Sequence, residues 1–298
     1  MNARLQNAVY APLWLMLHAA ARLPWRALYV LSDALAWLAC SVIRYRRHLV
    51  EANLAASFPE KTEEERRHIM HGFYRNFTDV FVETVKLLHV SDEEMRERMV
   101  FEGCELYEPI IREGRSVGVY CSHFCNWEWI TSITLWGVTG SDIEYSQVYR
   151  PLRNAWFDRF WFGLRKRFHS VSIPKNGVLR ALLTLRKTGG KFVTGFISDQ
   201  KPSHNDGHHS IDFLGQPTPF ISGTELLLRK LKAAAFYADV ERTSRGHYHV
   251  TIRRIADDVS TTEENAVTDA YAHMLEQTIR RQPDAWLWSH NRWRRPKH

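Results

Sequence analysis

The sequence has 298 residues, 45% of them hydrophobic and 24% charged, which is enough to bury a sizeable core and excludes a disordered tail or a multi-span membrane protein. The 40 Lys and Arg residues exceed the 33 Asp and Glu residues, so the net charge is +7. Such a chain favours an acidic partner, which leaves nucleic acid, an anionic membrane surface, a phosphorylated substrate and an acidic protein open.

The N-terminal segment is more apolar than the rest of the chain. Residues 8–21 and 27–43 are apolar runs, and the second is shorter than the about 20 residues of a clean membrane span. It ends in the basic and aromatic residues 44–47, of the kind found at lipid headgroups, which would place the remainder of the chain on the cytoplasmic side. Without a signal-type cleavage pattern, residues 1–47 are predicted to be a retained, membrane-anchoring helical segment. A helical hairpin buried against the core is the alternative.

Residues 48–298 are predicted to form one α/β domain with a central mixed sheet flanked by helices, because short β-type runs alternate with helical stretches. The helical segments are residues 51–97, 127–136 and 222–234, the last capped by Ser222. The β-type runs are residues 116–120, 192–197, 235–240 and 247–252.

The most informative residues come after the first β-type run. His123 comes directly after this strand, and Glu128 comes after four intervening residues. Five residues turn an ideal helix by about 500°, so the two side chains would not meet on one regular helix. We therefore place His123 in the strand-to-helix turn, where Glu128 reaches back to one imidazole nitrogen and leaves the other free as a general base.

Asp199 ends the run 192–197, where α/β sheets place ligand-binding groups, although the Ser-Asp-Gln sequence is also a plain turn. Two groups suggest metal ligands, but we predict no metal. Cys121 and Cys125 have no second pair at ligand spacing, and all four cysteines are too scattered for a disulfide framework, so a reducing compartment is favoured. A loop rich in Gly and Asn contains three histidines and an aspartate: His204, Asp206, His208 and His209.

The C-terminus combines tryptophan with basic residues. Such a block fits a membrane interface better than a single-stranded nucleic-acid platform in a chain that starts with apolar segments. Core tryptophans with a solvated basic tail are the alternative. The residues are Trp286, Trp288, Arg292, Trp293, Arg294, Arg295 and Lys297.

With these residues in place, the His-x4-Glu pattern resembles the His-x4-Asp/Glu motif of glycerolipid acyltransferases. Over residues 27–298 the chain resembles the branch that adds secondary acyl chains to lipid A. Phe58-Pro59-Glu60 lies upstream of the histidine, so it does not match the phosphate-contacting motif of the phospholipid-making branch. The similar blocks are residues 45–47, 57–60, 123–128, 148–151, 198–200, 212–215 and 286–293, with Asn53, Asn76, Glu83, Asn154, Asp158 and Arg165.

The resemblance implies a cofactor-free acyltransferase on the cytoplasmic face of the cell inner membrane. It would move an acyl chain directly from an acyl carrier protein thioester to a hydroxyl of a phosphorylated glycolipid, a lipid A precursor. An acyltransferase for another lipid or aminolipid, and a non-catalytic protein that binds membranes or nucleic acid, remain the alternatives. The implied catalytic residues are His123 and Glu128, Arg165 for the oxyanion or a phosphate, and Asp199 to orient Arg165 or a hydroxyl; the implied substrate-binding residues are Arg150, Asn126 and Gln200.

Overall fold

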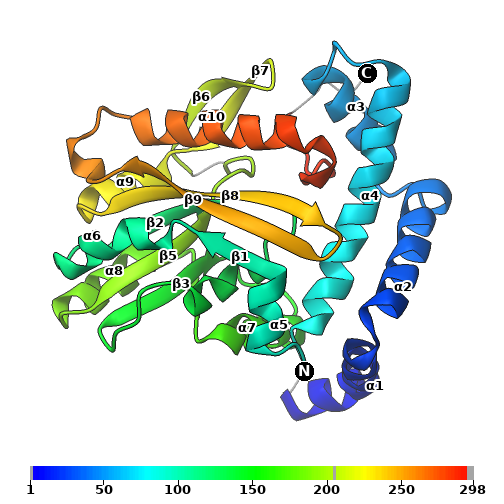
Figure 1. Ribbon diagram of the computed structural model, residues 1–298, viewed down its shortest axis with the longest axis horizontal. Helices are drawn as coiled ribbons and strands as arrows, with labels where there is room; N and C mark the ends of the chain where they lie inside the picture. The colour runs from blue at the N-terminus through cyan, green and yellow to red at the C-terminus, as the bar shows by residue number, and fades with distance from the viewer. Residues whose placement is uncertain (1–2, 204–205, 294–298) are drawn as a thin grey trace.

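The structure, a computed structural model, describes residues 3–203 and 206–293. Figure 1 shows a central sheet covered by helices, with one long upright helix along its end. The strands are β1 Met99–Glu102, β2 Val117–Cys121, β3 Ile143–Tyr149, β4 Val171–Pro174, β5 Lys191–Ile197, β6 His208–Phe213, β7 Gln216–Ile221, β8 Ala234–Ser244 and β9 His247–Ala256. The α-helices are α1 Ala3–Arg22, α2 Trp25–Trp37, α3 Arg47–Ser57, α4 Glu63–Lys86, α5 Asp92–Arg98, α6 Glu108–Arg112, α7 Ala155–Arg165, α8 Val178–Lys187, α9 Gly223–Lys230 and α10 Ala266–Arg281.

Seven strands form the main sheet in the order β1-β9-β8-β2-β5-β3-β4, and β6 and β7 form a separate antiparallel hairpin. Every pair in the main sheet is parallel except the β8–β9 hairpin. All five residues of β2 are buried, as expected for a central parallel strand covered on both faces. The predicted α/β fold with a mixed sheet is confirmed.

Helix α4 is the structural support of the site. A complete capping box at Thr62 and Glu65 starts it, and three acidic residues in its first turn complement the helix dipole. Its apolar side buries Phe73 and Tyr74 in the core. It packs against α2 on its outer side and against the turn η6 (Pro283–Ala285) near the C-terminus.

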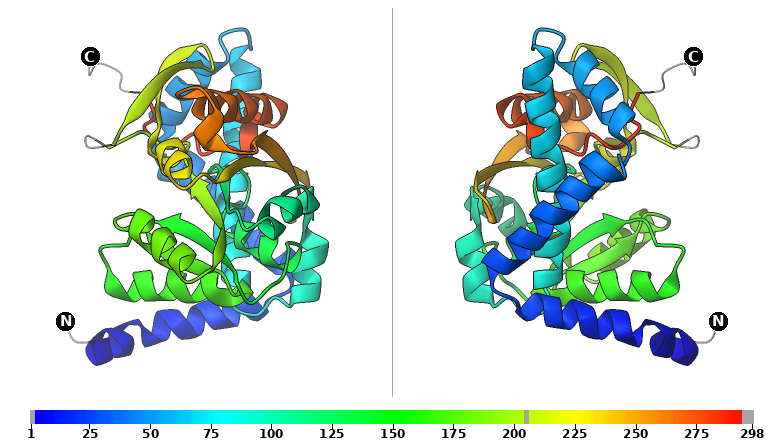
Figure 2. Two further views of the ribbon diagram at one scale, coloured as in Figure 1. Left: turned by 90° about the vertical axis from the view of Figure 1, so that its left-hand side faces the viewer. Right: turned by 90° about the vertical axis from the view of Figure 1, so that its right-hand side faces the viewer.

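The N-terminal helices lie outside α4. Helix α1 runs along the edge of the molecule and contacts α7, as Figure 2 shows. Among the described residues no single helix has the length and apolar character needed to cross a membrane, but Trp25–Val42 and Arg47–Ser57, bent by 88°, satisfy the test as a pair.

Several predicted element limits were wrong. The helix expected to run through Ala234 ends at Lys230, because the chain turns at Lys232 in the left-handed region and Ala234 already begins β8. The stretch after the histidine motif is a short 3-10 helix, η3, which starts only at Trp129 and ends at Leu135.

Candidate active site

His123 and Asp199 meet because their strands are parallel neighbours. Cys121 of β2 is in register with Ile197 of β5, and each site residue lies two positions beyond its strand. One Asp199 oxygen lies 2.7 Å from Nδ1 of His123, and the other accepts the His123 backbone N–H at 2.9 Å. The two side chains therefore form a pair of a buried carboxylate and a partly exposed imidazole at the carboxyl edge of the sheet, where α/β proteins bind ligands.

The groups around Asp199 keep its side chain in the ionised form. Burial alone would raise the pKa of Asp199, but the charge and hydrogen bonds of His123 and the indole N–H of Trp286, 2.9 Å away, lower that pKa to about 2. Asp199 is therefore a carboxylate that accepts the Nδ1–H of His123. The other ring nitrogen, Nε2, is then an acceptor for the Gln200 amide nitrogen at 3.1 Å, and it is the nitrogen that can take up a proton.

Glu128 does not reach His123, which corrects the sequence-based expectation. Its carboxylate instead accepts two parallel hydrogen bonds from Arg165 on α7, at 3.0 Å from Nε and 2.8 Å from Nη2. Asp199, expected to orient Arg165 or a hydroxyl, bonds the imidazole of His123 instead. The structure therefore pairs Asp199 with His123 and Glu128 with Arg165. The bidentate pair is largely buried, so it holds the guanidinium in one orientation.

The backbone of the motif explains this pairing. Cys125 has a φ of 50°, so the chain between His123 and Glu128 is a left-handed turn rather than the start of a helix. Contacts from distant segments hold this turn: the Cys125 N–H donates to the carbonyl of Ala285, and the Leu287 N–H donates to the carbonyl of His123. Segments far apart in sequence therefore set the direction of Glu128.

Asn126, predicted to bind substrate, is fully buried and makes its hydrogen bonds within the protein. Its amide nitrogen donates to Glu83 at 2.8 Å, and its oxygen accepts the backbone N–H of Trp129. Glu83 also accepts the hydroxyls of Tyr29 and Tyr248. Burial, and then the like charge of Asp79, raise the pKa of Glu83 to about 7. Glu83 on α4 thus holds the histidine loop, residues 123–128, through Asn126.

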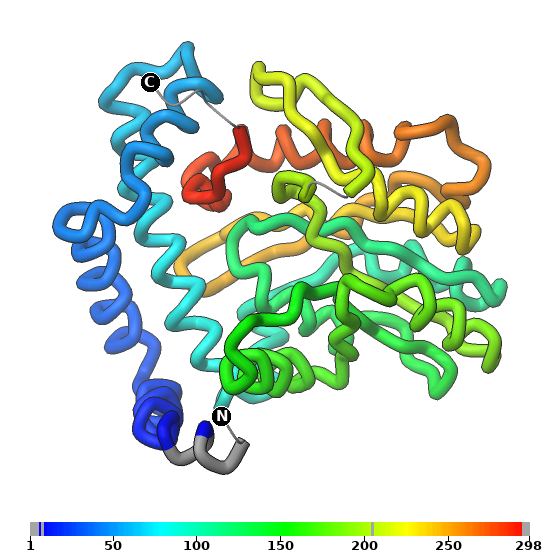
Figure 3. Tube along the Cα trace, turned by 180° about the vertical axis from the view of Figure 1, so that it is seen from behind, coloured from blue at the N-terminus to red at the C-terminus, as the bar shows by residue number. Residues whose placement is uncertain are grey.

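The C-terminal tryptophans are core residues, which corrects their predicted membrane-interface role. Trp286, Trp288 and Trp293 are 2%, 0% and 7% exposed. Phe124 and Trp286 form an antiparallel bridge beside the histidine, and Trp293 donates to the Thr218 hydroxyl of β7. Figure 3 shows this end of the chain between α4 and the β6–β7 hairpin. The segment forms a wall of the site.

The other predicted residues have no bond to the imidazole among the described residues. Arg150 is exposed after β3. His208 and His209 lie on β6, while His204 lies outside the described residues. No group of three potential metal ligands occurs in residues 3–203 and 206–293. Of the predicted site residues, the structure thus joins His123 to Asp199 and Gln200, and Glu128 to Arg165.

The two cysteines near the site are poor nucleophiles. Burial raises the pKa of the Cys121 thiol to about 12, and it also raises the pKa of Cys125. Both thiols therefore stay protonated at neutral pH. The Ser122 hydroxyl is buried, and no histidine or carboxylate bonds it among the described residues, so no base activates it.

Two hollows border α4. An apolar one beside the site is lined by Phe73, Phe77, Trp127 and Leu287, among others. The other has a volume of about 430 Å³ and includes Arg75, Arg242 and Arg245 in its wall.

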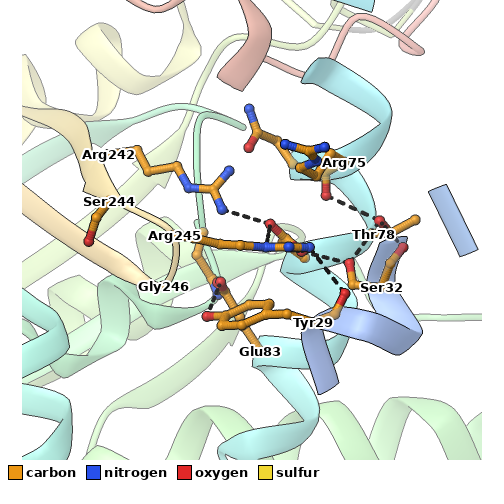
Figure 4. A network of polar contacts seen from close by, with 12 residues as sticks. Tyr29, Ser32, Arg75, Thr78, Glu83, Arg242, Ser244, Arg245 and Gly246 are labelled. Atoms are coloured by element: carbon orange, nitrogen blue, oxygen red, sulfur yellow. Dashed lines mark hydrogen bonds and ion pairs between the residues drawn. The ribbon is translucent and has the colours of Figure 1, made fainter. Parts of the chain in front are cut away.

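The arginines of the larger hollow have structural partners. Arg242 and Arg245 bond the buried carboxylate of Asp79, and Arg245 also pairs with Asp33 of α2, as in Figure 4. Arg75 lies 3.5 Å from the same Asp33. This network ties α2, α4 and the β8–β9 hairpin together.

Two supporting residues were not assigned roles from the sequence. Trp286 donates to Asp199, and Glu83 holds Asn126. Glu83 is an acidic residue within an apolar helical pattern and one of the positions that carry the family resemblance, but neither signal identifies Asn126 as its partner. Nothing local to Trp286 predicts its partner, which is 87 residues away.

Comparisons with known proteins point to one family. The family described as bacterial lipid A biosynthesis acyltransferase matches residues 3–295. The chain is 25% identical over 285 residues to a lipid A biosynthesis palmitoleoyltransferase of Escherichia coli (strain K12), covering 95% of this chain and 88% of that protein. A lauroyltransferase of lipid A biosynthesis from the same strain is 24% identical over 291 residues, covering 95% and 89%. A myristoyltransferase of that pathway is 19% identical over 246 residues, covering 82% and 73%.

Proposed function

Since the chain belongs to the family of bacterial lipid A biosynthesis acyltransferases, and is therefore an acyltransferase, we propose that it moves a fatty acyl chain from an acyl carrier protein thioester to a hydroxyl of a lipid A precursor. The single observation that carries this proposal is the His123–Asp199 pair, in which a buried carboxylate holds a partly exposed imidazole with its acceptor nitrogen Nε2. The names of three relatives, which specify palmitoleoyl, lauroyl and myristoyl transfer, support a fatty acyl donor.

In the proposed reaction, Nε2 of His123 takes the proton of the acceptor hydroxyl as the oxygen attacks the thioester carbonyl carbon. The tetrahedral intermediate then expels the thiolate of the carrier, and the imidazolium returns its proton to that sulfur, so an ester and a thiol result. Asp199 holds the imidazole in the required tautomer and stabilises the imidazolium. The protonated Cys121 and Cys125 thiols favour direct transfer over an acyl-enzyme.

Arg165 is proposed to stabilise negative charge in the site, on the oxyanion or on a phosphate of the acceptor. Its bidentate pair with Glu128 leaves Nη1 outside that pair and fixes the plane of the guanidinium. Glu128 would therefore act through Arg165 rather than through the imidazole. Gln200, bonded to Nε2, would yield this nitrogen to the acceptor hydroxyl.

Membrane association is proposed for residues 1–47, with the acyltransferase chemistry in residues 48–298, on the cytoplasmic side of the inner membrane. The bent apolar pair and the basic residues 44–47 support it. An exposed apolar surface on the N-terminal helices supports it as well. Its residues are Trp14, Leu15, Met16, Leu23, Val30, Leu31, Leu35, Trp37, Leu38, Val42 and Ile43.

The proposal is tested by incubating the purified full chain with acyl carrier protein thioester and a lipid A precursor and weighing the product by mass spectrometry. The wild type should add one acyl chain, and His123→Ala should lose at least about a hundredfold in rate. The matched control is His273→Ala, an exposed histidine of α10, which should keep full activity. Full activity of His123→Ala would refute the base. Acylation of a glycerolipid instead would refute the acceptor, and no turnover with any acyl donor would favour a binding protein.

A further inference from the structure

Arg292 is buried without a hydrogen-bond partner. Its side chain is 1% exposed, and Nε, Nη1 and Nη2 have no partner among the described residues. The guanidinium lies over the ring of Phe220, 4.3 Å from its centroid. A cation–π contact compensates only part of the lost hydration of a buried cation, so the position of this charge needs a further reason.

Asp199 supplies that reason. This carboxylate is 2% exposed, and its hydrogen-bond donors are two groups of His123 and the Trp286 indole, none of them a fixed cation. Burial lowers the pKa of Arg292 to about 10, and the charge of Asp199 is the main influence that opposes this shift. Arg292 therefore remains charged at neutral pH, and its charge interacts favourably with the buried carboxylate.

The short segment of residues 286–293 carries both the Trp286 donor to Asp199 and the Arg292 charge. Trp286 donates to Asp199, its ring contacts that of Trp293 at 6.1 Å, and Trp293 is the neighbour of Arg292. We propose that Arg292 is a positioning residue of the acyl transfer: its buried charge offsets Asp199 so that His123 stays free to accept the proton of the acceptor. This inference rests on the function proposed above.

The charges around His123 set how readily the imidazole is protonated. With the imidazole neutral, Asp199 and Arg292 cancel, whereas a protonated imidazole leaves one excess positive charge in a buried cluster. Burial lowers the pKa of the neighbouring His290 to about 4, so His290 is neutral at pH 7. Among the described residues, the charge of Arg46 also acts on His290, and Tyr271 of α10, a neutral phenol whose pKa burial raises, interacts with both Asp199 and Arg292.

Without Arg292, the Asp199 carboxylate would lose this compensating charge, and a protonated His123 would be favoured. His123 would then keep its proton to a higher pH, so it would be unable to act as a base over a wider pH range. A purely structural arginine predicts something different, namely a loss of activity by the same factor at every pH. The pH–rate profile therefore separates the two roles.

The test compares kcat/KM between pH 5.5 and 9.5 for the full-length wild type and three variants. Arg292→Met removes the charge and should move the acid limb up by about one pH unit, a loss that grows to about tenfold on the acid side of the profile and recovers by pH 9. Arg292→Lys keeps the charge and should stay within about threefold of the wild type across the range. Trp293→Phe perturbs the same segment without a charge change and should leave the limb in place. A ratio of Arg292→Met to wild type that is constant with pH overturns the proposal.

A second readout does not depend on turnover or on a stable Met variant. With ¹⁵N-labelled histidine, the imidazole signals of His123, assigned through His123→Gln, are tracked against pH by NMR in wild type, Arg292→Gln and Arg292→Lys. The Gln variant should retain the doubly protonated imidazole to a higher pH, and the Lys variant should match the wild type. Coincident titrations of Gln variant and wild type overturn the inference. An inactive wild type with the expected NMR shift instead rejects the proposed acyl transfer alone.

Discussion

Replacing Glu83 by Gln tests the buried support beneath the histidine loop. Glu83 is fully buried on α4 and accepts hydrogen bonds from Tyr29 at 3.0 Å, Asn126 at 2.8 Å and Tyr248 at 2.7 Å. Burial, and then repulsion from Asp79, raise the pKa of Glu83 from 4.5 to about 7. The folded protein therefore holds this proton where the unfolded chain releases it, and the stabilisation is fully present below about pH 4.5 and lost as pH rises towards 7.

The shift sets the magnitude of this effect. The difference between 4.5 and about 7 is about 2.5 pKa units, which corresponds to about 3 kcal/mol of folding free energy lost between these pH values. Gln has no ionisable group, so Glu83→Gln removes this pH dependence. Its amide nitrogen cannot accept a hydrogen bond from the tyrosines or Asn126, which costs about 1–3 kcal/mol at every pH.

Urea denaturation of the detergent-solubilised chain, monitored by tryptophan fluorescence at pH 5 and pH 8, measures both effects. The variant should be less stable than the wild type at pH 5, and the difference should shrink or reverse by about 2–3 kcal/mol at pH 8. Glu64→Gln, an exposed acid of the same helix, is the matched control and should parallel the wild type. Parallel pH dependences for wild type and Glu83→Gln would refute the reasoning.

Three further predictions concern the site, the membrane surface and the packing of α4. Asp199→Asn removes the carboxylate that holds the imidazole tautomer, so initial rates should fall by about 10²- to 10⁴-fold while the melting temperature shows a folded protein. Leu35→Ser with Trp37→Ser changes two exposed residues of α2 and should raise the soluble fraction after cell fractionation; unchanged membrane recovery would contradict the anchor. Gly72→Ala would place a methyl carbon 2.7 Å from the Asp284 carboxylate and should cost about 1–3 kcal/mol in thermal unfolding, whereas wild-type stability would show that η6 moves freely.

The parts of the site that the sequence predicted are those set by strand periodicity. His123 and Asp199 each come after a recognisable β-type run, and parallel neighbours bring such residues together at one edge. The partner of Glu128 was not predictable in this way. It depends on the left-handed Cys125 and on backbone bonds to Ala285 and Leu287, which no spacing between residues 123 and 128 encodes.

The burial of the C-terminal tryptophans was likewise not predictable from local composition. Trp286 and Trp288 beside basic residues match an interfacial pattern, yet their burial depends on pairing with residue 124 and packing against Phe58 and Phe213. The number of basic residues in the sequence also overstates the positive charge on the protein surface. Arg242 and Arg292 are buried or nearly so, one bonded to Asp79 and the other over the ring of Phe220. A net charge of +7 is therefore not a measure of the surface that meets a partner.

Helix α2 has two roles, although residues 1–47 were predicted to be a separate membrane-anchoring segment. Its outer face exposes Leu35 and Trp37, while its inner face donates from Ser32 to Asp79 and from Tyr29 to Glu83. Deleting residues 1–47 would therefore remove both the proposed membrane surface and two donors to buried carboxylates. Because Glu83 holds the loop that carries the proposed base through Asn126, loss of activity in such a truncation would not show that membrane contact is required. Outward-facing substitutions separate these effects, since they leave the inner bonds intact.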